Sequence, residues 1–230
     1  MTKEYKSEIA RRAVVAALGT GVVALGAMGK ARNASAQDGR WQPTLEKDDD
    51  WMELPGRHRL VFDAMSAEGA AHALFFTRNY IGVNKSAYGI EPSQLATIII
   101  LRHMATVFGY DDAIWAKYGK IFSDMSKFTD PKTHKEPTRN LYDVKGYGPG
   151  LANADATISD LAAQGVHFAV CGAATQRIVG MIAAQTKGNP DEIHRDFEAH
   201  LVPNARFVAA GIVAVNRAQE RGYAVSYYSG

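Results

Sequence analysis

The stretch Gly165-Val166-His167-Phe168-Ala169-Val170-Cys171-Gly172-Ala173-Ala174 decides the fold class of this chain. An apolar β run ends at Cys171, and a helical pattern begins directly after it. Such a change of period is typical of a strand that passes into a helix in an α/β sheet. In open α/β sheets, reactive and ligand-binding groups collect at the carboxyl ends of strands, where Cys171 is expected to lie.

Cys171 is the only cysteine among the 230 residues, and its expected position suits a reactive sulfur. The N-terminus of the following helix carries a partial positive charge, which favours the thiolate over the thiol. The alternative is that Cys171 is a small buried apolar residue, as free cysteines usually are. A single cysteine forms no intramolecular disulfide, so the hydrophobic core alone must stabilise the domain.

Five runs with the composition of strands alternate with helical patterns. The strand runs are residues 59–63, 95–101, 166–170, 206–208 and 223–228. Alternating strands and helices predict parallel βαβ units with right-handed crossovers. We therefore expect a three-layer α/β/α sandwich around a mainly parallel five-stranded sheet, and the strand order stays open.

The run LATIIIL at 95–101 is continuous and β-branched, which is typical of a strand buried on both faces. Asp111 or Asp112 is expected to cap one helix, and Asn189-Pro190 to begin another. Between residues 128 and 150 the periodic pattern stops, and three prolines indicate a long surface loop. Loops of this length are usually functional or mobile.

Residues 1–36 resemble an export signal. Arg11-Arg12 precedes a mildly apolar run of 17 residues from Ala13 to Gly29, and Ala34-Ser35-Ala36 matches the small-x-small pattern before a cleavage site. The arginine pair resembles a twin-arginine signal, which predicts bacterial export to the periplasm with cleavage before Gln37. The alternative is an uncleaved membrane anchor, although the run is shorter than the ~20 residues of a full span.

Removal of the signal changes the charge balance. The chain holds 26 basic and 24 acidic residues, of which residues 1–36 contain six and two, so the remainder has a formal charge of −2. No basic stripe remains that would predict nucleic-acid binding, and contact with a membrane is expected only during export. Residues 37–56 are polar and acidic and are expected to form an irregular lead-in to one domain at 57–230.

Arg102 and His103 follow the second strand run and are expected at the same sheet edge as Cys171. If the two strands are neighbours, a guanidinium or imidazolium near the sulfur would favour the thiolate further. The alternative is that Arg102 caps carbonyl groups and His103 packs. Asp63 and Ser66 follow the first strand run and would add polar side chains to this edge.

Metal and cofactor sites are not predicted. His194 and His200 are six residues apart, which places them on different helix faces, and no other His, Asp or Glu spacing matches a known ligand set. The turn after the first strand, residues 65–69, lacks the glycine fingerprint of dinucleotide-binding folds. A Cys-His hydrolase built on Cys171 and His103 is chemically conceivable, but no signature supports it.

From about residue 59 to 228 the chain resembles the DsrE/DsrF-like family of sulfur-relay proteins. The resemblance lies in the pattern GVxFxxC at Gly165–Cys171, in Arg177 six residues later, and in Arg102-His103 after the second strand. It continues in Gly211-Ile212-Val213 and in residues 218–225, which follow the family ending LQxxGYAYI.

This resemblance implies the α/β/α fold, assembly into homo-oligomers, and a persulfide on Cys171 exchanged with sulfur donor and acceptor proteins. The activity would then be sulfurtransferase-like. Export and the loop at 128–150 depart from the family pattern. Two functions stay open: a persulfide-carrying sulfur transfer protein, and a non-catalytic ligand-binding or assembly module in which Cys171 is structural.

Overall fold

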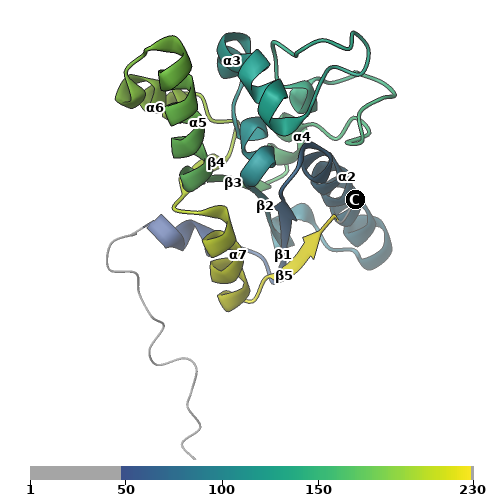
Figure 1. The fold of residues 1–230 in the computed structure, drawn as a ribbon. Helices are drawn as coiled ribbons and strands as arrows, with labels where there is room; N and C mark the ends of the chain where they lie inside the picture. The colour runs from purple at the N-terminus through teal and green to yellow at the C-terminus, as the bar shows by residue number, and fades with distance from the viewer. Residues whose placement is uncertain (1–47, 229–230) are drawn as a thin grey trace, which may run out of the picture. The chain divides into compact units, whose positions relative to one another are not determined.

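The computed structural model describes residues 48–228. Its strands are β1 (His58–Ala64), β2 (Leu95–Leu101), β3 (His167–Cys171), β4 (Ala205–Val208) and β5 (Ala224–Tyr227). They form one parallel sheet in the order β4-β3-β2-β1-β5 (Figure 1). The predicted α/β class is confirmed, and all five strand runs are strands. The predicted signal and its cleavage site lie outside the described residues.

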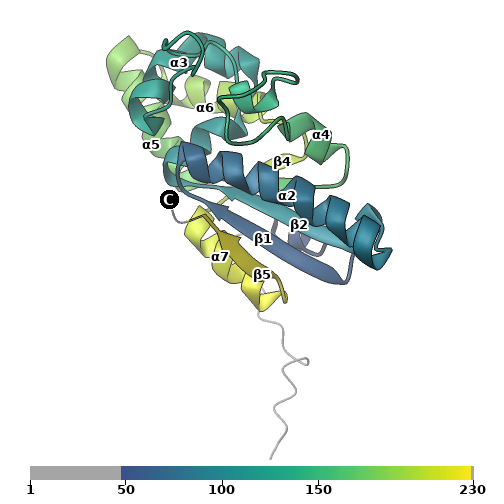
Figure 2. The same cartoon turned by 90° about the vertical axis from the view of Figure 1, so that its right-hand side faces the viewer.

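Helices cover both faces of the sheet. They are α2 (Ala67–Tyr88), α3 (Asp112–Ser126), α4 (Ile158–Ala162), α5 (Gly172–Thr186), α6 (Pro190–Ala199) and α7 (Gly211–Glu220). Short 3-10 helices are η1 (Asp48–Met52), η2 (Pro92–Gln94), η3 (His103–Gly109) and η4 (Leu141–Asp143). Figure 2 shows α7 on one side of the sheet and the other α-helices on the opposite side. Within the described part of the chain, no helix is both long and apolar enough to cross a membrane.

The central strand β2 supplies side chains to both cores. All seven of its residues are buried, as its continuous apolar sequence predicts. Ile99 and Leu101 join the larger core beneath α2, α3 and α5, whereas Ile98 and Ile100 join the smaller core beneath α7. This alternation places the carboxyl end of β2 between two packed layers, which fixes the position of the residues that follow it.

The helix starts follow local capping chemistry. Asp111 caps α3, because its Oδ1 accepts hydrogen bonds from the backbone N–H groups of Ala113 at 2.9 Å and Ile114 at 3.4 Å. Asn189 caps α6 through the N–H of Asp191 at 2.9 Å, with Pro190 in the first turn. Both caps agree with the sequence-based expectation, which had left Asp111 and Asp112 open as alternatives.

The loop predicted at 128–150 is anchored to the larger core. Asn140 is fully buried, and its Nδ2 donates to the carbonyl oxygens of Phe108 at 3.0 Å and Tyr110 at 2.9 Å. A Cβ at Gly119 of α3 would lie 2.0 Å from the carbonyl oxygen of Pro137, so only glycine permits this close approach of the loop. The irregular segment therefore packs as part of the domain.

Residues 48–56, the described part of the predicted lead-in, contain η1 and cover part of the smaller core. Met52 is fully buried there. Its carbonyl oxygen accepts hydrogen bonds from Tyr223 Oη at 2.7 Å and from Arg59 at 3.3 Å. The second guanidinium nitrogen of Arg59 donates to the carbonyl oxygen of Leu54 at 3.1 Å. The smaller core is thus closed by α7 and by this segment together.

Candidate functional site

The sheet order makes β2 and β3 direct neighbours, which the sequence had left open. Leu101 lies opposite Val170 in the parallel register, so Arg102 and Cys171 occupy the next positions along the two strands. Arg102 N–H also donates to the carbonyl oxygen of Ala64 at 3.0 Å, which ties it to the end of β1. Residues from three strand ends therefore meet at one edge of the sheet.

The sulfur of Cys171 accepts two backbone hydrogen bonds. The N–H of Ala174 in the first turn of α5 lies 3.4 Å from Sγ, and the N–H of Gly211 at the start of α7 lies 3.2 Å from it. Cys171 is therefore the N-cap of α5, and it is 7% exposed. Two helix N-termini point N–H groups at one sulfur, an arrangement that stabilises negative charge on it.

The main chain of Cys171 is held from the other side. Its carbonyl oxygen accepts a hydrogen bond from the hydroxyl of the buried Thr175 at 2.9 Å. That hydroxyl also lies 2.5 Å from the phenolic oxygen of Tyr110. Because its only proton is used in the bond to Cys171, Tyr110 is the donor of this second bond. Burial raises the pKa of Tyr110 well above its ordinary value, which keeps the phenol protonated and able to donate.

Arg102 forms a bidentate ion pair with Asp63. Its Nε lies 2.6 Å from Oδ1, and a second guanidinium nitrogen lies 2.8 Å from Oδ2. The side chains are 16% and 13% exposed, so the pair is largely shielded from water. The hydrogen bond to Asp63 raises the pKa of Arg102, with a smaller contribution from the nearby Cys171. Asp63 therefore balances most of the positive charge of Arg102 and reduces its electrostatic effect on the sulfur of Cys171.

The other two predicted polar residues are placed differently. His103 is exposed and has a φ of 56°, and its Nδ1 accepts a hydrogen bond from the N–H of Met104 at 2.9 Å. No hydrogen bond joins its ring to Cys171 in the described structure. Ser66 caps α2 through the N–H of Gly69 at 3.0 Å and lines a different pocket, away from the cysteine.

Cys171, Arg102 and His103 line one pocket of about 470 Å³. The remaining lining comes mostly from apolar side chains, and Arg177 of α5 adds a guanidinium. The complete lining is Arg102, His103, Met104, Met125, Cys171, Ala173, Ala174, Arg177, Met181, Ala210, Gly211 and Ile212. Volume and composition are those of a site for a small organic molecule.

Sequence reasoning missed two groups of this site. Gly211 is 40 residues from Cys171, so no local pattern identifies its N–H as a partner of the sulfur. The methionines at 104, 125 and 181 lie on three different elements, η3, α3 and α5, so no local pattern in the sequence groups them. Arg177 could be identified from the sequence, because it follows Cys171 by six residues in the helix predicted after the strand.

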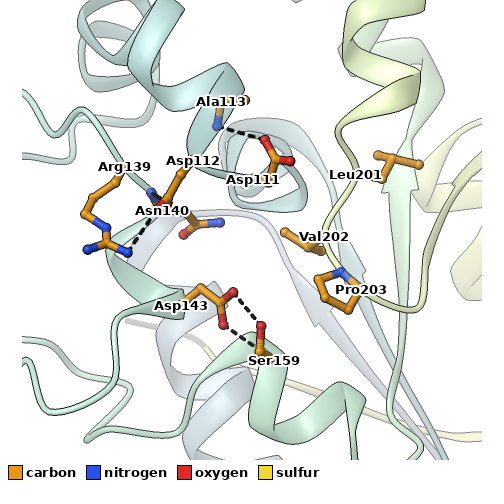
Figure 3. Close-up of a pocket in the computed structure, with 10 residues that line it drawn as sticks. All are labelled: Asp111, Asp112, Ala113, Arg139, Asn140, Asp143, Ser159, Leu201, Val202 and Pro203. Carbon is orange, nitrogen blue, oxygen red and sulfur yellow. Dashed lines mark hydrogen bonds and ion pairs between the residues drawn. The ribbon is translucent and has the colours of Figure 1, made fainter.

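A second pocket, of about 440 Å³, lies between the starts of α3 and α4 (Figure 3). Three carboxylates line it, and each has a structural partner. Asp111 caps α3, Asp112 pairs with Arg139 at 2.9 Å, and Asp143 accepts hydrogen bonds from the N–H and hydroxyl of Ser159 at 2.6 Å each. These contacts stabilise the start of α3 and the irregular segment, so the three carboxylates have structural roles.

In residues 48–228, no cluster of three or more His, Cys, Asp or Glu side chains is arranged to hold a metal ion. Comparison with models of protein families, with curated proteins and with solved structures finds no match to this chain. The geometry around Cys171 is therefore the principal guide to function.

Proposed function

We propose that this chain is an exported DsrE/DsrF-like protein that carries sulfane sulfur as a persulfide on Cys171. The observation that supports it is the pair of N–H groups from Ala174 and Gly211 that converge on Sγ. Oriented backbone N–H groups at helix N-termini favour the thiolate and would equally favour a persulfide anion. The adjoining pocket gives a donor or acceptor access to the sulfur.

The loading step balances with polysulfide as the donor. The Cys171 thiolate attacks a terminal sulfane sulfur, and a new S–S bond forms on the protein. The adjacent S–S bond of the polysulfide breaks, and its electron pair leaves with the shortened polysulfide anion. No oxidant is consumed, because the transferred sulfur is already at the sulfane oxidation level.

Mass spectrometry of the native protein after incubation with polysulfide tests this proposal. We expect a gain of one sulfur atom, reversible by dithiothreitol, and no gain in Cys171→Ser. Iodoacetamide should also modify native Cys171 rapidly near neutral pH. His103→Ala removes an imidazole from the lining of the Cys171 pocket and should slow this alkylation, although no hydrogen bond joins the two side chains. It should not unfold the protein, because the exposed imidazole contributes no core volume.

A binding or assembly module with a structural cysteine is the second candidate. It is favoured by the 7% exposure of Cys171 and by the capping role of its sulfur at α5. This candidate predicts that Cys171 reacts with iodoacetamide and polysulfide only after denaturation. That result, with Cys171→Ala altering stability alone, would exclude the sulfur-transfer proposal.

A further inference from the structure

The pocket beside Cys171 is much larger than an inorganic sulfur species requires. Ala174, Arg177 and Met181 follow Cys171 at intervals of three to four residues, which places them on one face of α5. From Cys171 to Met181 the helix axis rises by about 15 Å. The lining that α5 contributes therefore extends along the helix from Cys171 to Met181, and we call this pocket the trough.

The walls of this trough are apolar and adaptable. Met104, Met125 and Met181 come from three different elements and line it together with Ile212. Methionine side chains are flexible and polarisable, and they suit irregular apolar ligands. A hydrated inorganic anion gains nothing from such walls, whereas an alkyl chain leaves water on entering them.

The charges in the trough favour an anionic group on the ligand. Arg102 is balanced by the bidentate contact with Asp63. Arg177 is exposed, and it has no carboxylate partner among residues 48–228. Its guanidinium is therefore the uncompensated positive charge of the lining, and it matches a carboxylate or a similar anion.

We propose that the sulfur acceptor or donor at Cys171 is an organic thiol, or its persulfide, with an apolar chain and an anionic group. This inference rests on the proposed function and names its substrate class. In the acceptor direction, the thiolate of the ligand attacks the outer sulfur of the Cys171 persulfide. A new S–S bond joins that sulfur to the ligand, the S–S bond on the protein breaks, and Cys171 leaves as the thiolate.

The test uses 2-pyridyl disulfides that carry methyl, hexyl, 5-carboxypentyl or 5-trimethylammoniopentyl groups. Cys171 attacks the alkyl sulfur, and the released 2-thiopyridone is followed by its absorbance. Each rate is divided by that of N-acetylcysteine to remove intrinsic reactivity. We expect hexyl to exceed methyl by at least about tenfold, as burial of several methylenes implies. The carboxylate should exceed the trimethylammonium probe by roughly two- to fivefold.

Matched variants assign these preferences to the trough. Arg177→Gln should abolish the preference for the carboxylate and keep that for hexyl, and Met181→Gln should weaken the preference for hexyl. Arg195→Gln on the exposed surface of α6 and Met65→Gln outside the lining make the same chemical changes elsewhere and should alter neither.

The outcomes separate the two proposals. If polysulfide loads Cys171 but hexyl reacts no faster than methyl, the organic ligand is excluded and the sulfur-transfer function survives. The organic ligand is likewise excluded if Arg195→Gln changes the charge preference as much as Arg177→Gln does. If native Cys171 reacts with neither polysulfide nor any probe, the proposed function itself fails.

Discussion

Gly211 occupies a position where no larger residue fits. A Cβ at this position would lie 2.4 Å from Cβ of Arg102 and 2.9 Å from its Cδ. The closer contact is to the rigid base of the side chain, so a rotamer change does not relieve it. Since the N–H of Gly211 donates to Sγ of Cys171, a shift of α7 would also disturb the sulfur.

Gly211→Ala should therefore lower the free energy of unfolding by about 1–3 kcal/mol, the usual cost of overpacking, and slow alkylation of Cys171. Urea denaturation and iodoacetamide kinetics measure the two effects. Gly180→Ala in α5 is the control, because an added Cβ has no neighbour within 4 Å there. It should raise stability by roughly 0.5–1 kcal/mol through helix propensity. Equal behaviour of the two variants would contradict the packing argument.

His167 should make the protein less stable in mild acid. Burial lowers the pKa of His167 below 6.5, and the Arg206 guanidinium lowers it further. At pH values above the pKa that His167 has in the unfolded chain, its imidazole is neutral in both the folded and the unfolded chain. As the pH falls below it, the unfolded chain takes up a proton that the folded chain does not, so stability is lost until the folded pKa is reached. Urea midpoints should fall between about pH 7.5 and pH 5, and less so in His167→Gln. An identical slope in both proteins would exclude this residue as the cause.

The segment η1 contributes to stability although it precedes the first strand. Met52 is fully buried in the smaller core, together with side chains of the sheet and of α7. Met52→Ala should cost about 2–5 kcal/mol in unfolding free energy, because it leaves a cavity in that core. Met65→Ala is the matched control: Met65 is 47% exposed, so its loss should stay within about 0.5 kcal/mol. Similar urea midpoints for both variants would show that η1 is dispensable.

We predict that the chain is exported through the twin-arginine route. Arg11-Arg12, the mild apolar run and Ala34-Ser35-Ala36 lead to this prediction. N-terminal sequencing of the protein from its native host should begin at Gln37, and replacement of Arg11 and Arg12 by lysine should block export. Recovery of the full-length chain in the membrane fraction would support the anchor alternative instead.

Self-association is a second property expected at the scale of the whole domain. β5 is an outer strand of the sheet, and Tyr227 on it is 70% exposed. An outer strand with unpaired backbone groups is a natural surface for a second copy. Light scattering at micromolar concentrations should give at least a dimer. A mass equal to one chain across the whole concentration range would refute this prediction.

The sequence by itself determined the strands and the starts of α3, α5 and α6, because both depend on neighbours in the chain. The run at 95–101 is apolar at nearly every position, and β2 is buried at every position. Asp111 and Asn189 cap helices through N–H groups two residues away. Cys171 was placed at a strand end by the same local change of period. Periodicity records which side chains leave water, and capping is a short-range hydrogen bond, so neither requires knowledge of the tertiary structure.

Only the tertiary structure decided what surrounds the sulfur. The order β4-β3-β2-β1-β5 brings Arg102 beside Cys171. It also brings Asp63 to Arg102, and this carboxylate balances the positive charge that the sequence analysis had expected to act on the Cys171 sulfur. Gly211 reaches Sγ from 40 residues away. Strand order and charge pairing follow from the packing of whole layers, and layer packing sums many long-range contacts that leave no periodic trace in the chain.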